Sequence, residues 1–191
     1  MKNLKKLSLI TLLILAQPLI SYSNTIKILA TINEQIITNY DLQKEIKYLE
    51  EINQKKISIN NKVNILNLMI DEKIKIMELD KFKISINKNL TEKKYKTILK
   101  ENNLNEKDKN LKKYLIKKIE TNQRWNKFIS IKYSNKLEIN MSEIDEIMNL
   151  KKIPLEKKED FINSEKNKKL AIWSRITFNE VKKSYFVKKN I

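Results

Sequence analysis

The chain contains no glycine, and this absence restricts its backbone more than any other feature of the sequence. Glycine supplies the positive φ angles and close backbone approaches that P-loops and dinucleotide-binding loops require, so both motifs are excluded. Cysteine and histidine are absent as well. Their absence excludes Ser-His-Asp and Cys-His triads, the usual zinc sites and any disulfide framework. We therefore expect no cofactor, no metal site and none of these common enzyme classes.

The chain is strongly basic. Its 191 residues include 40 Lys and Arg against 23 Asp and Glu, for a net charge of +17, and only two of the 40 are Arg. Lys, Ile and Asn together make up 93 residues, a bias that A/T-rich coding DNA produces, so the charge is interpreted first as codon bias. The alternative is an anionic partner: nucleic acid, lipid or an acidic polypeptide. Because base readout relies on forked Arg side chains, sequence-specific DNA binding is disfavoured.

The first 23 residues resemble a secretory signal peptide. Three Lys residues precede the apolar run Leu7–Ile20, and Ser21 and Ser23 supply the small side chains of an A-x-A-like cleavage site. The run has 14 residues, whereas a membrane span needs about 20, so cleavage after Ser23 is favoured over an uncleaved anchor. We expect a mature chain of residues 24–191 with a net charge of +14, located in the periplasm.

Strands are predicted at both ends of this mature chain. Residues 26–32 alternate apolar and polar side chains, and residues 35–38 form a short return strand, which together predict a hairpin. A tight hairpin usually has glycine at the second turn position, so Glu34 there predicts a wider or strained turn. Residues 185–187 predict a terminal strand that pairs with the hairpin and brings the chain ends together.

The residues between these strands have the apolar spacing of amphipathic helices. Helix starts are predicted at capping patterns that begin with Thr38, Asn89 and Ser142. The predicted helices cover about 38–52, 60–81, 89–102, 106–133, 141–148 and 161–183. The polar segment 151–160, which contains Pro154, predicts a linker or loose turn. The predicted fold class is mainly α, with a small antiparallel sheet formed by the N-terminal hairpin and the C-terminal strand.

The order of these elements resembles the SurA family of periplasmic chaperones for outer-membrane proteins. The block from Ile28 to Leu42 is similar to the family's opening, where a strand, an Asn-Gly turn and a second strand ending in Ile-Thr precede a helix that starts at Asp-Leu. Met69–Lys73 resembles the family's Leu-Ile-Asp-Glu-Lys-Leu helix, and Leu170–Lys188 resembles its C-terminal helix and strand. The resemblance implies one SurA-like domain over residues 24–191, made of a part at 24–150, the linker at 151–160 and a closing part at 161–191.

One departure from the family concerns its enzyme activity. SurA proteins usually carry one or two parvulin-type prolyl-isomerase domains between the N-terminal part and the last helix, and those domains use paired His and several Gly. Here the ten residues 151–160 stand in that place, and the chain has neither His nor Gly. We therefore expect a chaperone without isomerase chemistry and no catalytic residues.

The resemblance implies a cradle that holds unfolded outer-membrane proteins or other extended polypeptides. Such a surface needs exposed apolar side chains that adapt to many sequences, and Met is suited to this because it is flexible and polarisable. Met141 and Met148 are further Met residues near the short helix. For the Met residues, and for the aromatic residues of the long predicted helix, the alternative interpretation is a role in the core. The predicted peptide-binding residues are Met69, Met77, Trp125, Phe128 and Tyr133.

Two pairs of adjacent acids were considered for general acid–base chemistry, and a structural role is favoured for both. Asp71, next to Glu72, has Lys75 one helical turn later, which predicts a solvated helix pair. Asp145 and Glu146 lie in the first turn of a predicted helix, where acids complement the helix dipole. Two other functions stay open at this point: a residual prolyl isomerase, and a basic protein that binds anionic lipid surfaces.

Overall fold

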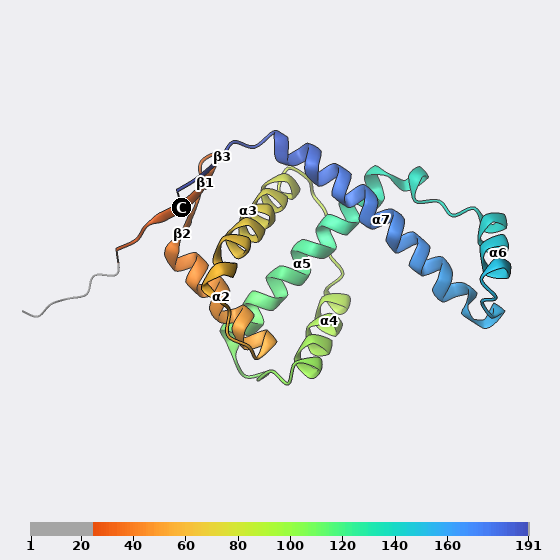
Figure 1. The fold of residues 1–191 in the computed structure, drawn as a ribbon, viewed down its shortest axis with the longest axis horizontal. Coiled ribbons are helices and arrows are strands. Elements are labelled where there is room, and N and C mark those ends of the chain that lie inside the picture. The colour runs from red at the N-terminus through yellow and green to blue at the C-terminus, as the bar shows by residue number, and fades with distance from the viewer. Residues whose placement is uncertain (1–24, 191) are drawn as a thin grey trace, which may run out of the picture.

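Three strands and six helices make up residues 25–190, the part of the chain that the computed structural model describes (Figure 1). The strands are β1 (Ile28–Ile32), β2 (Gln35–Thr38) and β3 (Val187–Lys189). The helices are α2 (Asn39–Asn53), α3 (Lys62–Leu79), α4 (Lys88–Glu101), α5 (Lys109–Lys132), α6 (Met141–Leu150) and α7 (Lys158–Lys183). This confirms the predicted mainly α fold with a small sheet. The predicted signal peptide, residues 1–23, lies outside the described residues.

The sheet joins the two ends of the described chain. β1 lies between β2 and β3 and is antiparallel to both, so the predicted pairing of the terminal strand with the hairpin is confirmed. Alternate residues of the hairpin, Ala30, Ile32 and Ile37, are buried because one face of the sheet packs against the helices. The terminal strand begins two residues later than predicted. Tyr185 instead packs on α3, where its hydroxyl group donates a hydrogen bond to Glu78 Oε2 at 3.0 Å.

The hairpin turn is tight, although glycine is absent from it. Ile32 pairs directly with Gln35, so Asn33 and Glu34 form a two-residue turn, and of the two expected alternatives the wider turn is excluded. Asn33 adopts the positive φ angle, 49°, while Glu34 is not among the described residues with positive φ. Asn tolerates the left-handed region better than other residues that carry a Cβ atom. Asn33, the first turn residue, therefore adopts the positive φ angle, and glycine is not required at position 34.

Three of the six described helices, α4, α5 and α6, are capped by an Asn or Asp side chain. The predicted capping box at the start of α2 is confirmed, with Thr38 and Asp41 bonding each other's backbone N–H groups. The caps predicted for α4 and α6 were wrong, because Asn87 and Asn140 accept the first-turn N–H bonds. Thr91, expected at the start of α4, is buried inside that helix against α5, where its hydroxyl accepts a hydrogen bond from Gln123.

The core consists of three clusters of buried side chains, two of which share residues of α7. The first joins the sheet to α2 and α3, and the second joins α2, α4 and α5. The third joins the end of α3 to α5 and α7, with Leu79, Trp125, Phe128 and Ile129 at its centre. We refer to residues 25–133 and 173–190, which contain these clusters, as the body. None of the helices among the described residues is long and apolar enough to cross a membrane.

The remaining segment, residues 134–172, projects from the body and is called the arm (Figure 1). It contains α6 and the first half of α7, and only Ile144 and Met148 are buried within it. The predicted linker at 151–160 is shorter than expected. A short 3-10 turn covers Leu155–Lys157 and α7 begins directly after it, at Lys158. The connection between α6 and α7 thus lies at the end of the arm that is remote from the body (Figure 1).

Candidate functional site

Two of the five predicted peptide-binding residues belong to the core. Trp125 is 2% exposed and Phe128 is 8% exposed, because α7 covers the face of α5 that carries them. The indole Nε1–H of Trp125 donates a hydrogen bond to Ser174 Oγ of α7 at 2.8 Å. Lys75 lies over the same ring, 5.6 Å from its centroid, and burial lowers the pKa of this Lys. Trp125 and Phe128 therefore hold α7 on the body and do not line an open surface.

Tyr133 lies where the arm leaves the body. It is half-buried, and its ring stacks on Trp173 of α7 with 4.5 Å between the ring centroids. Its hydroxyl oxygen accepts a hydrogen bond from Thr177 Oγ1 at 3.0 Å. Tyr133 therefore sets the direction in which α7 and the arm leave the end of α5.

Met69 and Met77 both lie on α3. Both are half-buried and pack against the cluster under the sheet. Met69 also lines a small pocket of about 210 Å³ between β2, α2, α3 and α5. The five predicted residues are thus distributed over two core clusters and the base of the arm, and the fold does not bring them together in one surface.

The pocket beside Met69 contains a network of charged side chains. Lys118 Nζ donates to Glu45 Oε1 at 2.8 Å and also to Glu72 Oε2, while Tyr114 donates to the same Glu45 oxygen at 2.8 Å. Burial and the neighbouring Glu45 carboxylate raise the pKa of Tyr114 well above its usual value. Lys118 thus bridges the two carboxylates, and these residues connect α2, α3 and α5.

Three of the four acids in the two acid pairs make contacts between elements. Asp71 pairs with Lys182 of α7 at 2.6 Å, so its partner within ion-pair distance is not the predicted Lys75. Glu72 belongs to the network around Lys118. Asp145 pairs with Lys158 across the connection between α6 and α7 at 2.5 Å. Among the described residues, no group of three or more acidic side chains is placed to hold a metal ion.

An apolar groove of about 740 Å³ lies on the arm, next to the point where it joins the body. We call it the arm groove. Its floor and walls come from the end of α5, the segment before α6, the first residue of α6 and the first half of α7. The residues that line it are Ser130, Ser134, Leu137, Glu138, Ile139, Met141, Ile162, Lys166, Asn167 and Leu170.

Half of the residues that line the arm groove are apolar and half are polar. Leu137 ends a short 3-10 turn, and Lys169 of α7 holds the segment that follows it by donating a hydrogen bond to the carbonyl oxygen of Glu138 at 2.6 Å. Met141 is 46% exposed and forms one edge of the groove. A volume of this size lies in the range of about 300–1,000 Å³ that ligand-binding pockets occupy. The groove can therefore take a few apolar side chains of a bound molecule.

Sequence analysis missed this groove, although part of its signal was present. Met141 had been noted as a Met residue near the short helix, but its place beside Leu137 and Ile139 in one groove depends on α7. The chain matches no known protein family model, and no curated protein sequence is significantly similar to it. The arm groove is therefore identified by its geometry and its chemistry alone.

Proposed function

We propose that the chain is a periplasmic chaperone that holds unfolded outer-membrane proteins, or similar extended polypeptides, in the arm groove. The observation that carries this proposal is an open apolar groove on a thin element that projects from a well-packed body. Strands of outer-membrane barrels alternate apolar and polar residues, so an extended segment presents a row of apolar side chains to such a groove. The polar lining residues Glu138, Lys166 and Asn167 suit a polypeptide backbone that must remain solvated.

Two further observations support this proposal. The elements follow the order on which the SurA resemblance rests, including a terminal strand that returns to the hairpin. The arm has only two buried residues, so its apolar side chains have room to adapt to different ligands. We propose binding without isomerase chemistry, because the connection between α6 and α7 has the length of a loop and no His is present.

The first experiment measures aggregation of an outer-membrane β-barrel protein diluted from urea, followed by light scattering with and without residues 24–191 of the chain. Suppression at both low and high salt is expected, because apolar burial is insensitive to screening. Suppression at low salt alone would mean that the positive charge does the binding. Absence of suppression at both salt concentrations would contradict the proposal.

A pair of matched variants assigns the activity to the arm groove. Ile139→Glu combined with Met141→Glu places two charges in the groove, and we expect it to reduce suppression at least about fivefold, since each buried apolar contact contributes about 1 kcal/mol or more. Val63→Glu combined with Leu68→Glu makes the same change on the exposed face of α3 and should leave suppression unchanged. Equal activity of both double variants would show that the client binds elsewhere.

A further inference from the structure

The positive charge of the described chain is unevenly distributed along the sequence. Residues 81–133, which include α4 and α5, contain 16 Lys and Arg against 5 acids. Residues 173–190 contain 5 basic residues and 1 acid, whereas the arm contains 8 of each and residues 25–80 contain 8 basic and 9 acidic residues. Codon bias acts along the whole chain, so it does not explain why acids are scarce in residues 81–133 and 173–190 alone. The basic residues of α4 and α5 therefore need an account of their own.

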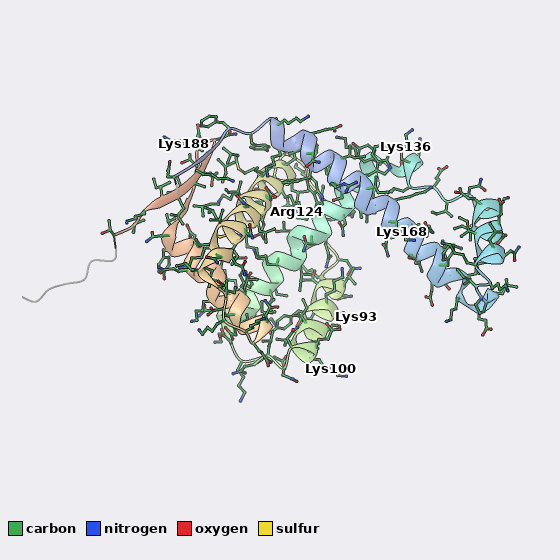
Figure 2. The ribbon with its side chains drawn as sticks, in the orientation of Figure 1. Lys93, Lys100, Arg124, Lys136, Lys168 and Lys188 are labelled. Atoms are coloured by element: carbon green, nitrogen blue, oxygen red, sulfur yellow. The ribbon has the colours of Figure 1, made fainter. Side chains whose placement is uncertain are left out.

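The outer face of α4 presents the most accessible part of this charge. Tyr95 and Leu99 turn inward to α5, while Lys93, Lys96 and Lys100 are exposed. Spacings of three and four residues place these three side chains in one row along the helix. Figure 2 shows Lys93 and Lys100 on the side of α4 that points away from α5. We call this row the α4 lysine face.

The ammonium groups of the α4 lysine face are unpaired. Within residues 25–190, none of the three takes part in a side-chain hydrogen bond, an ion pair or a cation–π contact, although other Lys residues of the body do. Of the two acids on α4, Glu92 is already paired with Lys112 of α5, which leaves Glu101 at the end of the helix. The charge of this face is therefore available to a partner.

The shape of the face indicates what kind of anionic partner it fits. Lys93, Lys96 and Lys100 are all exposed, and the pockets described for residues 25–190 are lined by other elements, so these lysines stand on the outer surface of the helix and not in a groove. An acidic peptide needs a groove to bury its backbone and side chains, whereas a flat membrane surface can meet a convex helix. Lys is a compact point charge that needs no fixed geometry around a phosphate.

We propose that the α4 lysine face docks the protein on a membrane surface that carries anionic phospholipid headgroups. Each Lys near such a surface raises the partition coefficient about fivefold, so a row of three produces a reversible attachment. Leu90, on the outer side of the same helix and partly exposed, supplies an apolar contact at the edge of the row. This attachment leaves the arm groove free, because α4 lies on the body and the arm extends away from it (Figure 1).

The test is co-sedimentation of residues 24–191 with lipid vesicles, since residues 1–23 are apolar and would themselves bind lipid. We expect binding to vesicles of phosphatidylcholine and phosphatidylglycerol in equal parts, loss of binding at high salt, and none to phosphatidylcholine alone. Lys93→Glu, Lys96→Glu and Lys100→Glu together should lower the partition coefficient at least about tenfold. A control with the same charge change on the arm, at Lys136, Lys157 and Lys168, should lower it less than about threefold.

Each other outcome overturns the proposal. An equal loss in the two triple variants would mean that only the net charge matters, and an unchanged α4 variant would place the lipid contact elsewhere. Binding of soluble polyglutamate that is lost in the α4 variant while vesicle binding persists would identify a polypeptide surface. Circular dichroism checks that the variants are folded, and substitution of the same three lysines by Gln provides a version with smaller structural effect. Because arm-groove variants do not touch α4, this test is independent of the chaperone assay.

Discussion

Asn33 is the residue at which the two ends of the described chain are held together. Its positive φ angle permits the two-residue turn between β1 and β2. Its backbone N–H donates to Phe186 O at 2.9 Å, and its side-chain Oδ1 accepts from Phe186 N at 2.9 Å. One residue thus supplies both the turn conformation and the anchor of the segment that leads into β3.

Substitutions at Asn33 should separate these two roles. Asn33→Ala removes the side-chain bond and places a less tolerant residue in the left-handed region, so we expect it to lower the free energy of unfolding by about 2 kcal/mol. Asn33→Gly removes only the bond and should cost about 1 kcal/mol. Urea denaturation of both variants checks this difference. Equal stability of the two would show that the positive φ angle is not costly at this turn.

At the scale of elements, the contact between α5 and α7 determines where the arm emerges. Trp125 and Phe178 meet edge to face with 6.1 Å between the ring centroids, and Trp125 also bonds Ser174. The Tyr133–Trp173 stack continues the same contact toward the arm. Removal of these contacts would free the C-terminal half of α7 from the body and displace the arm.

The bond between Trp125 and Ser174 can be measured with a double-mutant cycle. Ser174→Ala leaves the buried indole N–H without its partner, so we expect the free energy of unfolding to fall by about 1–3 kcal/mol. In a Trp125→Phe background the N–H is absent, and the same Ser174→Ala change should cost less than about 0.5 kcal/mol. Chemical denaturation of the four proteins gives these values. The same cost in both backgrounds would exclude the bond as a source of stability.

At the scale of the whole molecule, the body and the arm differ in packing. Nearly all fully buried side chains of the described chain lie in the body, and the arm contributes Ile144 and Met148. Residues with few buried contacts open at lower free energy than those in a core. The structure is therefore expected to behave as a stable body that carries a more easily opened arm.

Hydrogen exchange should reveal this difference. We expect the backbone amides of α6 to exchange at least about tenfold faster than those of α3 and of the centre of α5, because the arm opens without unfolding the body. Mass spectrometry of exchanged peptides checks the order, with bound unfolded client expected to slow exchange in α6. Uniform protection of α6 and α3 would show that the arm and the body unfold as one unit.

The sequence by itself determined the fold class and most of the element order. Alternation in β1 and the spacing of apolar residues in α3 and α5 are local patterns, and they depend on periods of two and 3.6 residues that any reader of the chain can count. The capping box at Thr38 was predictable for the same reason, since its partners lie three residues apart. Helix starts at Asn87 and Asn140 were missed because several nearby residues were equally suitable caps.

Only the tertiary structure decided which apolar faces are covered. The periodicity of α5 marks Trp125 and Phe128 as apolar, but whether they face a ligand or α7 depends on a helix that begins 33 residues after Trp125. The arm groove and the α4 lysine face arise in the same way, from contacts between segments far apart in the chain. The residues next to a side chain in the sequence do not determine such contacts, because its burial depends on the distant segments that pack against it.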